Sequence, residues 1–143
     1  MPIIIRKAKI EDFDVIYDFI CQLEETTFRK IAFRKIFFKN LAAEHIYYLV
    51  AEREKTVVGF ISIYIQPQLH HCAKVAEIME LFVEKNFRNQ NIGSALIHKA
   101  KNIAQKNKCD VIEVATNVKR KETHRFYEKE SFGRTHLKFT MKL

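Results

Sequence analysis

The spacing of apolar residues divides the chain into helical and extended segments. In residues 11–25 the apolar side chains recur at three- and four-residue intervals, which predicts an amphipathic helix. The same kind of spacing predicts helices at residues 29–43, 91–107 and 120–130. Short runs of β-branched and other apolar residues predict strands, and they lie at residues 3–8, 46–53, 56–66, 75–83, 110–116 and 132–143.

The order of these segments predicts the class of fold. A strand, two helices, three strands, a helix, a strand, a helix and a last strand form one α/β layer structure with a mixed sheet. Two residues, Glu54 and Lys55, separate the second and third strands, which is the spacing of a hairpin. Pro67 cannot donate a ladder hydrogen bond, so we expect the third strand to end near it. At 143 residues without a linker or repeat, residues 1–143 are expected to form a single domain.

Composition narrows the choice of partners. Hydrophobic residues make up 48% of the chain and charged residues 29%, as in a soluble globular protein. The net charge of +8 suits an anionic ligand, but the basic residues are spread out and no nucleic-acid motif is present, so we expect no nucleic acid partner. The three cysteines are widely separated, which favours free thiols in the reducing cytoplasm. The apolar run at the N-terminus is too short for a signal sequence or a membrane helix, so we expect a cytoplasmic protein without a membrane partner.

A basic, amide-rich turn connects the strand at residues 75–83 to the helix at residues 91–107. The first amides of a helix have no intrahelical partner, and the helix dipole adds positive potential at the same point. The turn at residues 84–94 is therefore a candidate anion site. The alternative is an ordinary strand-to-helix loop with a solvated Arg88.

Two motifs resemble a known family. Residues 88–94, RNQNIGS, resemble the Arg/Gln-x-x-Gly-x-Gly/Ala turn of the GNAT superfamily of acetyl-CoA-dependent N-acetyltransferases. Asn91 replaces the first glycine, and Asn tolerates the left-handed backbone conformation better than most residues. Residues 117–132 resemble the second GNAT signature, a helix that carries Phe-Tyr and ends at Gly-Phe, with Ser131 in place of the glycine. Further segments are similar to the aminoalkylphosphonate N-acetyltransferase branch, at residues 32–34, 69–71, 77–81, 116–120, 124–127 and 136–140.

This resemblance implies a fold, a cosubstrate and its contacts. The GNAT fold is an α/β (α+β) structure whose mixed, mainly antiparallel sheet has about six to seven strands and about four helices, with a splay between strands 4 and 5. The splay exposes backbone groups to acetyl-CoA. The family resemblance implies that acetyl-CoA donates its acetyl group to the primary amine of a small molecule. The resemblance to the branch implies that this small molecule is an aminoalkylphosphonate. The implied contacts with acetyl-CoA are Leu81, Phe82, Val83, Arg88, Asn89, Gln90, Asn91, Ile92, Gly93, Ser94, Tyr127 and, on the facing strand, Asn117.

The chemistry requires a base and an acid. An alkylammonium has a pKa of about 10.4, so a base must take its proton before it attacks the thioester. Glu77 is the first candidate by its resemblance to the family's acidic position, and Glu80 is the second. Their odd separation predicts opposite faces of a regular strand unless a bulge intervenes. Tyr127 matches the family tyrosine that protonates the leaving thiolate. Each of these residues also has a purely structural alternative: a salt bridge for Glu77 or Glu80, and a place in the hydrophobic core for Tyr127.

Three further residues are candidates for the acceptor site. His70 and His71 are adjacent, so in an extended segment their rings point to opposite sides, and one could join Glu77 to hold a divalent metal or an anionic group. The branch resemblance implies a possible divalent cation, but no ligand spacing identifies a metal site. Arg34 could form a bidentate pair with a phosphonate, or it could lie on a solvated helix face.

Other functions stay open at this point. The acceptor could be a polyamine, an aminoglycoside, an amino acid or a protein amine. A GNAT-shaped regulatory module that binds CoA without turnover is a third reading, and the presence of Glu77 and Tyr127 argues against it. The sequence leaves a homodimer open as well.

Overall fold

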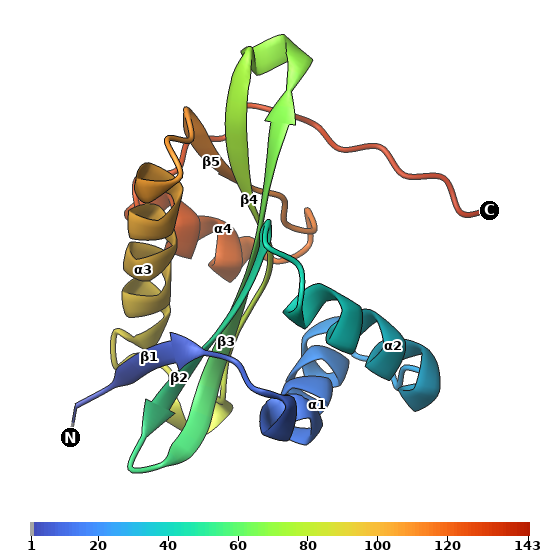
Figure 1. Cartoon of the computed structure of the whole chain (residues 1–143). Helices are drawn as coiled ribbons and strands as arrows, with labels where there is room; N and C mark the ends of the chain where they lie inside the picture. The colour runs from blue at the N-terminus through green and yellow to red at the C-terminus, as the bar shows by residue number, and fades with distance from the viewer. Residues whose placement is uncertain (1) are drawn as a thin grey trace.

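The computed structural model describes residues 2–143 as a five-stranded sheet with helices on both faces (Figure 1). The strands follow chain order across the sheet. In the described residues, β4 and β5 pair in parallel, and all other neighbouring strands pair antiparallel. The strands are β1 (Ile4–Lys7), β2 (Ile46–Arg53), β3 (Thr56–Gln68), β4 (Ala73–Val83) and β5 (Val111–Val114). The helices are α1 (Phe13–Glu24), α2 (Lys30–Leu41), α3 (Ile92–Lys106) and α4 (Lys121–Lys129), so the four expected helices are confirmed.

Apolar residues on the two faces of the sheet build two cores. On one face α1 and α2 cover Val50, Phe60 and Phe82, and the rings of Phe19 and Phe82 lie 4.9 Å apart. On the other face α3 and α4 cover a larger core, which includes Ile61 and Ile63. Both faces of β3 are covered, which explains its nearly continuous run of buried residues.

The hairpin between β2 and β3 forms as its sequence predicts. Glu54 and Lys55 both have positive φ, at 49° and 64°. Two left-handed residues in a two-residue loop are the mark of a type I′ turn, whose twist matches that of the strands it joins. The expected hairpin is therefore confirmed.

A bulge in β4 changes which side chains share a face. Ser62 of β3 pairs with Glu80, whereas Ile63 pairs with Ile78, so Met79 has no partner on β3. The extra residue shifts the alternation of side chains by one position. Glu77 pairs with Tyr64 and Glu80 with Ser62, so both carboxylates lie on the α1/α2 face. Glu77 and Glu80 therefore do not lie on opposite faces, as they would in a regular strand, because β4 has the bulge that was expected to be the exception.

Strands β4 and β5 separate after a short ladder. They pair only from Val75–Val111 to Ile78–Val114. From Met79 to Val83 the β5 side of β4 has no strand beside it among the described residues. The expected splay between the fourth and fifth strands is thus present, and it begins at the bulge.

The expected strand at residues 132–143 is absent. Helix α4 ends in a Schellman motif in which the N–H of Phe132 donates to Tyr127 O at 2.9 Å and that of Ser131 to Glu128 O at 3.0 Å. Ser131 has the left-handed φ of 74° usually supplied by glycine. Residues 133–143 then extend away from the body (Figure 1), fully exposed and without a neighbouring strand. The described sheet accordingly has five strands rather than six to seven.

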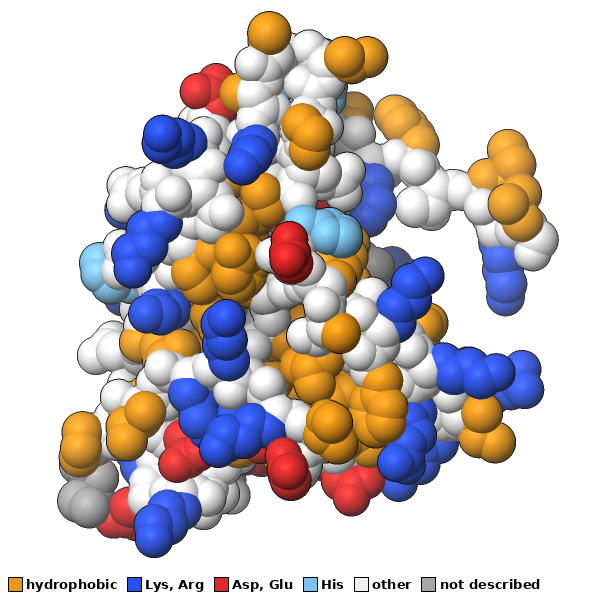
Figure 2. Space-filling view, in the orientation of Figure 1, with side chains coloured by type: hydrophobic (Ala, Val, Ile, Leu, Met, Phe, Trp, Pro, Cys, Tyr) orange, Lys and Arg blue, Asp and Glu red, His pale blue; other side chains and the backbone are white. Residues whose placement is uncertain are grey.

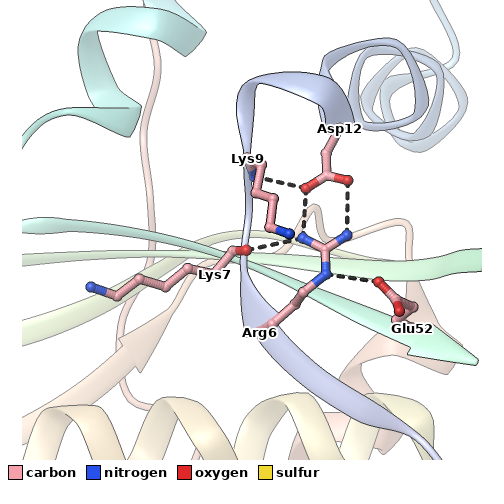
Figure 3. A network of polar contacts seen from close by, with 5 residues as sticks. All are labelled: Arg6, Lys7, Lys9, Asp12 and Glu52. Carbon is pink, nitrogen blue, oxygen red and sulfur yellow. Dashed lines mark hydrogen bonds and ion pairs between the residues drawn. The ribbon is translucent and has the colours of Figure 1, made fainter. Parts of the chain in front are cut away.

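Arg6 fastens the N-terminal strand to the segment before α1 (Figure 3). Its guanidinium donates to both carboxylate oxygens of Asp12, at 2.8 and 3.0 Å, and its Nε donates to Glu52 of β2 at 2.7 Å. The backbone N–H of Lys9 also donates to Asp12, at 2.7 Å. Burial alone would raise the pKa of Asp12, but the hydrogen bonds from Arg6 and Lys9 outweigh it, so this pKa lies below its ordinary value.

Within residues 2–143 the helices are all too short or too polar to cross a lipid bilayer.

Arg6→Met tests this network. The variant leaves the nearly buried carboxylate of Asp12 without its cation, so we expect the free energy of unfolding at neutral pH to fall by about 3–5 kcal/mol in urea titrations. The Asp12 contribution is present above the ordinary carboxyl pKa and is lost as pH falls through the lowered folded-state pKa. The difference between wild type and variant should therefore shrink in acid.

Arg134→Met is the matched control, because Arg134 makes a similar bidentate pair with Glu128 on an exposed surface. We expect this variant to lose less than ~1 kcal/mol. Equal losses in both variants would contradict a special role for Arg6.

Candidate active site

The turn between β4 and α3 presents a row of free backbone amides. Asn89 and Asn91 have positive φ, at 61° and 62°, and Asn91 caps α3 without a side-chain hydrogen bond. The first amide that bonds into the helix is that of Ala95, to Asn91 O at 3.0 Å. In the described chain the amides of residues 89–94 have no acceptor. A concave row of N–H groups at a helix N-terminus favours an anion.

Side chains around this turn hold its shape. Arg88 Nε donates to Val83 O at 2.8 Å, and its guanidinium lies 5.3 Å from the ring of Phe82. Arg53, at the end of β2, donates to the side chain of Gln90. The Arg53 Nε atom is buried and has no partner in residues 2–143. Arg88 therefore anchors the turn to β4, and Arg53 adds a positive charge beside it.

Gly93 serves the packing of α3 against α4. A Cβ on Gly93 would come within 3.1 Å of the ring of Phe126. The neighbouring Ser94 hydroxyl donates to Glu130 at 3.2 Å, which also joins the two helices. A larger residue at Gly93 would therefore press on the ring of Phe126 in α4.

The bulge in β4 places Glu80 in a polar cluster on the α1/α2 face. The Ser62 hydroxyl donates to the Glu80 carboxylate and accepts the Glu80 backbone N–H at 3.0 Å. Asn40 of α2 donates to the hydroxyls of Tyr48 and Tyr64, at 2.9 and 2.8 Å. Tyr64 is the register partner of Glu77. The cluster therefore gathers hydroxyl groups of β2 and β3 on the face of the sheet that carries Glu80 and Glu77.

Burial changes the acidity of two of these groups. Loss of solvent raises the pKa of Glu80, and the hydrogen bond from Ser62 offsets only part of this rise, while the nearby charge of Glu24 adds to it. Burial also raises the pKa of the Tyr48 phenol. Glu80 is thus a carboxylate with raised affinity for a proton, at the strand position where the splay opens.

Tyr127 lies on the other side of the splay, in the core under α3 and α4. Its ring packs against Phe126 and Phe132, with centroids 5.2 and 5.4 Å away. The contact with Phe132 belongs to the Schellman motif, so the end of α4 sets the position of the tyrosine. Burial raises the pKa of Tyr127 to about 12, although the charge of Arg120 opposes the rise.

Arg120 connects α4 to α1. Its Nη2 atom donates to Leu23 O at 3.0 Å and to Glu24 at 3.3 Å. Arg120 also opposes the rise in the pKa of Tyr127, and its partner Glu24 adds to the rise in the pKa of Glu80.

The histidine pair differs from its expected arrangement. Residues Leu69–His71 form a 3-10 turn at the tip of the β3–β4 hairpin instead of an extended segment, and Cys72 closes the turn with a φ of 50°. The two rings therefore lie side by side, 4.4 Å apart, rather than on opposite sides. His71 faces Glu113 of β5, at 3.6 Å, and Glu113 is the register partner of Glu77.

The possible metal site would need a cluster of ligating side chains. In residues 2–143 no three His, Cys, Asp or Glu side chains are grouped to hold an ion.

Asn117 and Arg34 occupy surface positions. Asn117 follows β5 in a loop, so its expected place on a strand is wrong; its side chain accepts from Lys119 N at 2.9 Å. Arg34 is exposed on α2, and its guanidinium lies 5.0 Å from the ring of Phe38 and 5.4 Å from that of Phe13. These rings hold Arg34 in place while its N–H donors have no partner among the described residues.

Sequence reasoning missed the residues that support the site from distant elements. Ser62 is the one with a visible signal, since it is the one serine in the apolar run of β3. Asn40, Tyr48, Arg53 and Arg120 act through partners far along the chain, which a local pattern does not indicate.

Comparisons with known proteins agree with this arrangement. The acetyltransferase (GNAT) family model matches residues 13–133. An aminoalkylphosphonate N-acetyltransferase of Salmonella typhimurium is 39% identical over 144 aligned residues, which cover 100% of this chain and 94% of the relative.

Solved structures share the fold at low sequence identity. A transcriptional regulator from Bacillus halodurans has a TM-score of 0.92 at 22% identity, over 99% of this chain and 100% of the regulator. An aminoglycoside N-acetyltransferase in complex with CoA has a TM-score of 0.88 at 16% identity, over 99% and 95% of the two chains. The family match, the full-length relative and the splayed sheet together show that the chain belongs to the GNAT family and is an acetyltransferase.

Proposed function

We propose that this enzyme transfers the acetyl group of acetyl-CoA to the primary amine of an aminoalkylphosphonate. The observation that carries the proposal is the 39% identity, over the whole chain, to an enzyme named for that acceptor. The free amides of residues 89–94 and the polar cluster around Glu80 supply groups for the two substrates. In this proposal residues 1–143 act as one domain, and the three free cysteines fit a cytoplasmic protein.

Acetyl-CoA binds along the splay. Its pyrophosphate accepts hydrogen bonds from the amides of the Asn89–Ser94 turn, as the helix dipole favours. The pantetheine arm runs along the open edge of β4 at Leu81, Phe82 and Val83, whose backbone has no strand on that side. The thioester then lies between Glu80 and Tyr127.

Protons move through these two side chains. Glu80 takes a proton from the acceptor ammonium, and its raised pKa makes it a stronger base than an ordinary carboxylate. The neutral amine attacks the thioester carbon, and the C–S bond breaks as the amide bond forms. Tyr127, whose raised pKa keeps its phenol protonated at neutral pH, gives its proton to the departing thiolate. The attacking nitrogen loses its second proton as the amide forms, and this proton restores the phenol of Tyr127. Glu80 releases the first proton to solvent when the products leave. Glu77 lies on the same face as Glu80 and attracts the ammonium group of the acceptor.

The phosphonate end of the acceptor requires cations. Arg34 is held over two aromatic rings with its donors free, which leaves its planar fork available to an anion. His70 and His71 are the other candidates for this end, at the β3–β4 tip.

The cosubstrate site is tested by Asn91→Asp. Aspartate tolerates the left-handed φ of 62° and adds a negative charge at the N-terminus of α3, which stabilises a helix but repels a pyrophosphate. We expect the affinity for acetyl-CoA to fall about tenfold, or ~1.4 kcal/mol, in isothermal titration calorimetry, without loss of thermal stability. Asn102→Asp, further along α3, is the matched control. Unchanged affinity in Asn91→Asp would remove this assignment.

The acceptor is tested by a panel of amines. We expect aminoethylphosphonate to release free CoA thiol much faster than propylamine, spermidine, an aminoglycoside or a peptide amine. Arg34→Ala should raise KM chiefly for the phosphonate, whereas Lys35→Ala, which removes a charge from the same helix, should not. Equal rates for charged and uncharged acceptors would contradict the phosphonate proposal. Binding of CoA without thiol release from any amine would favour the regulatory-module reading instead.

A further inference from the structure

Two phenols share the α1/α2 face of the sheet with the two carboxylates of β4. Tyr48 of β2, Ser62 of β3 and Glu80 of β4 are register partners in one row across the three strands. Tyr64 of β3 and Glu77 of β4 pair in a neighbouring row. Both phenols and both carboxylates are half-buried rather than sealed in the core. This face therefore presents hydroxyl groups on β2 and β3 and carboxylates on β4, all within reach of a small molecule.

Asn40 of α2 determines how these phenols can bind. Its side-chain nitrogen donates to the hydroxyl oxygens of Tyr48 and Tyr64, at 2.9 and 2.8 Å. An amide nitrogen has two hydrogens, so these two contacts use both of them, and each phenol oxygen acts as an acceptor. A phenol that accepts a hydrogen bond still has its own proton to donate.

At least one of the two phenol protons is left for a ligand. Burial raises the pKa of Tyr48 against the effect of the Asn40 hydrogen bond, and the neighbouring Tyr64 hydroxyl adds to the rise. The Tyr48 proton can thus be shared with Tyr64. In residues 2–143 the Tyr64 hydroxyl accepts from Asn40 and donates to no side chain. The pair therefore has an oriented donor without an acceptor.

The spacing of these groups suits a small zwitterion. Neighbouring strands lie about 4.8 Å apart, and Tyr64 of β3 is directly beside Glu77 of β4. The ammonium and the phosphonate of an aminoalkylphosphonate are only a few bonds apart. An acceptor whose ammonium is held by the carboxylates of β4 would thus place its anionic end over β3 and β2, where the phenols are.

Helix α2 adds positive potential above this part of the sheet. Residues 26–43 contain no Asp or Glu, and Figure 2 shows Lys and Arg side chains around α2 at the lower right. Such a helix attracts an anion to the phenols that Asn40 holds. A basic residue in the last turn also offsets the negative end of the helix dipole near Asn40. The cations of α2 are Lys30, Arg34, Lys35 and Lys39.

We propose that Tyr48 and Tyr64 donate hydrogen bonds to the phosphonate oxygens of the acceptor and that Asn40 is the residue that positions them. The proposal rests on the proposed function, from which it takes the acceptor, and it adds the residues that select this acceptor at short range. The α2 cations supply attraction over a longer range, and the phenols supply direction. Selection of the anionic acceptor thus depends on uncharged donors beside Glu77 and Glu80.

Removal of single hydroxyls is the first test. We expect Tyr48→Phe and Tyr64→Phe to raise KM for aminoethylphosphonate, by about tenfold in Tyr64→Phe, because a hydrogen bond to a charged oxygen is lost. Both variants should keep the kcat/KM of the wild type for propylamine, which has no anionic group and also reports correct folding. Tyr47→Phe is the matched control, since Tyr47 lies on the opposite face, where its hydroxyl accepts from Asn107 at 3.2 Å. This control should leave both acceptors unaffected.

Asn40→Asp tests the orientation of the phenols without changing their number. An aspartate of the same shape accepts the phenol protons instead of donating to the phenol oxygens, and it adds a negative charge. We expect KM for aminoethylphosphonate to rise by more than tenfold, whereas KM for propylamine should not rise. Asn107→Asp makes the same exchange beside Tyr47 and should change neither KM.

The two acceptors separate failure of this inference from failure of the proposed function. A wild type that prefers aminoethylphosphonate to propylamine, with an unchanged phosphonate KM in Tyr64→Phe and Asn40→Asp, would overturn the role of the phenols and leave the proposed function standing. An equal loss for both acceptors in these variants would show a purely structural role and would overturn it as well. A wild type without preference for the phosphonate would overturn both.

Discussion

The site depends on the point in β4 where the regular strand is interrupted. Before Met79, β4 pairs on both sides, with β3 and with β5. At Met79 a bulge shifts the alternation of side chains, and from there on the β5 side is open. The bulge thus places a second carboxylate, Glu80, on the same face as Glu77 at the place where the sheet opens. A regular strand would have sent Glu80 into the apolar core under α3.

The elements around this point hold the opening in place. On one side, α1 and α2 cover the sheet and supply Glu24 and Asn40 to the polar cluster around Glu80 and the tyrosines. On the other side, the C-terminal end of α4 positions Tyr127, and Arg120, at the N-terminal end of the same helix, donates to Leu23 O of α1. The base and the acid of the proposed reaction therefore belong to different faces of the sheet, Glu80 to the α1/α2 face and Tyr127 to the core under α3.

Much of this arrangement could be predicted from local sequence. The four helices and the Glu54-Lys55 hairpin follow from periodicity and turn chemistry, and the structure has them. The resemblance to the GNAT motifs places Asn91 and Ser131 where the family has glycines, and both residues have positive φ. The bulge at Met79 could not be located, because the run around it reads as an ordinary strand. Residues 132–143 also read as a strand, but a strand needs a neighbour, which local sequence does not specify. The contacts of Ser62 and Arg120 were missed for the same reason, since their partners are remote in sequence.

The central claim is that the bulge makes Glu80, rather than Glu77, the group that takes the proton. The direct measurement is the pH dependence of kcat/KM for the wild type and for the matched variants Glu80→Gln and Glu77→Gln. We predict that Glu80→Gln loses ~10²–10⁴-fold in turnover together with the acid limb of the profile, which in the wild type lies above the ordinary carboxyl pKa because burial raises that of Glu80. Glu77→Gln should keep this limb and chiefly raise KM. Loss of the limb in Glu77→Gln, with Glu80→Gln near wild type, would contradict the account.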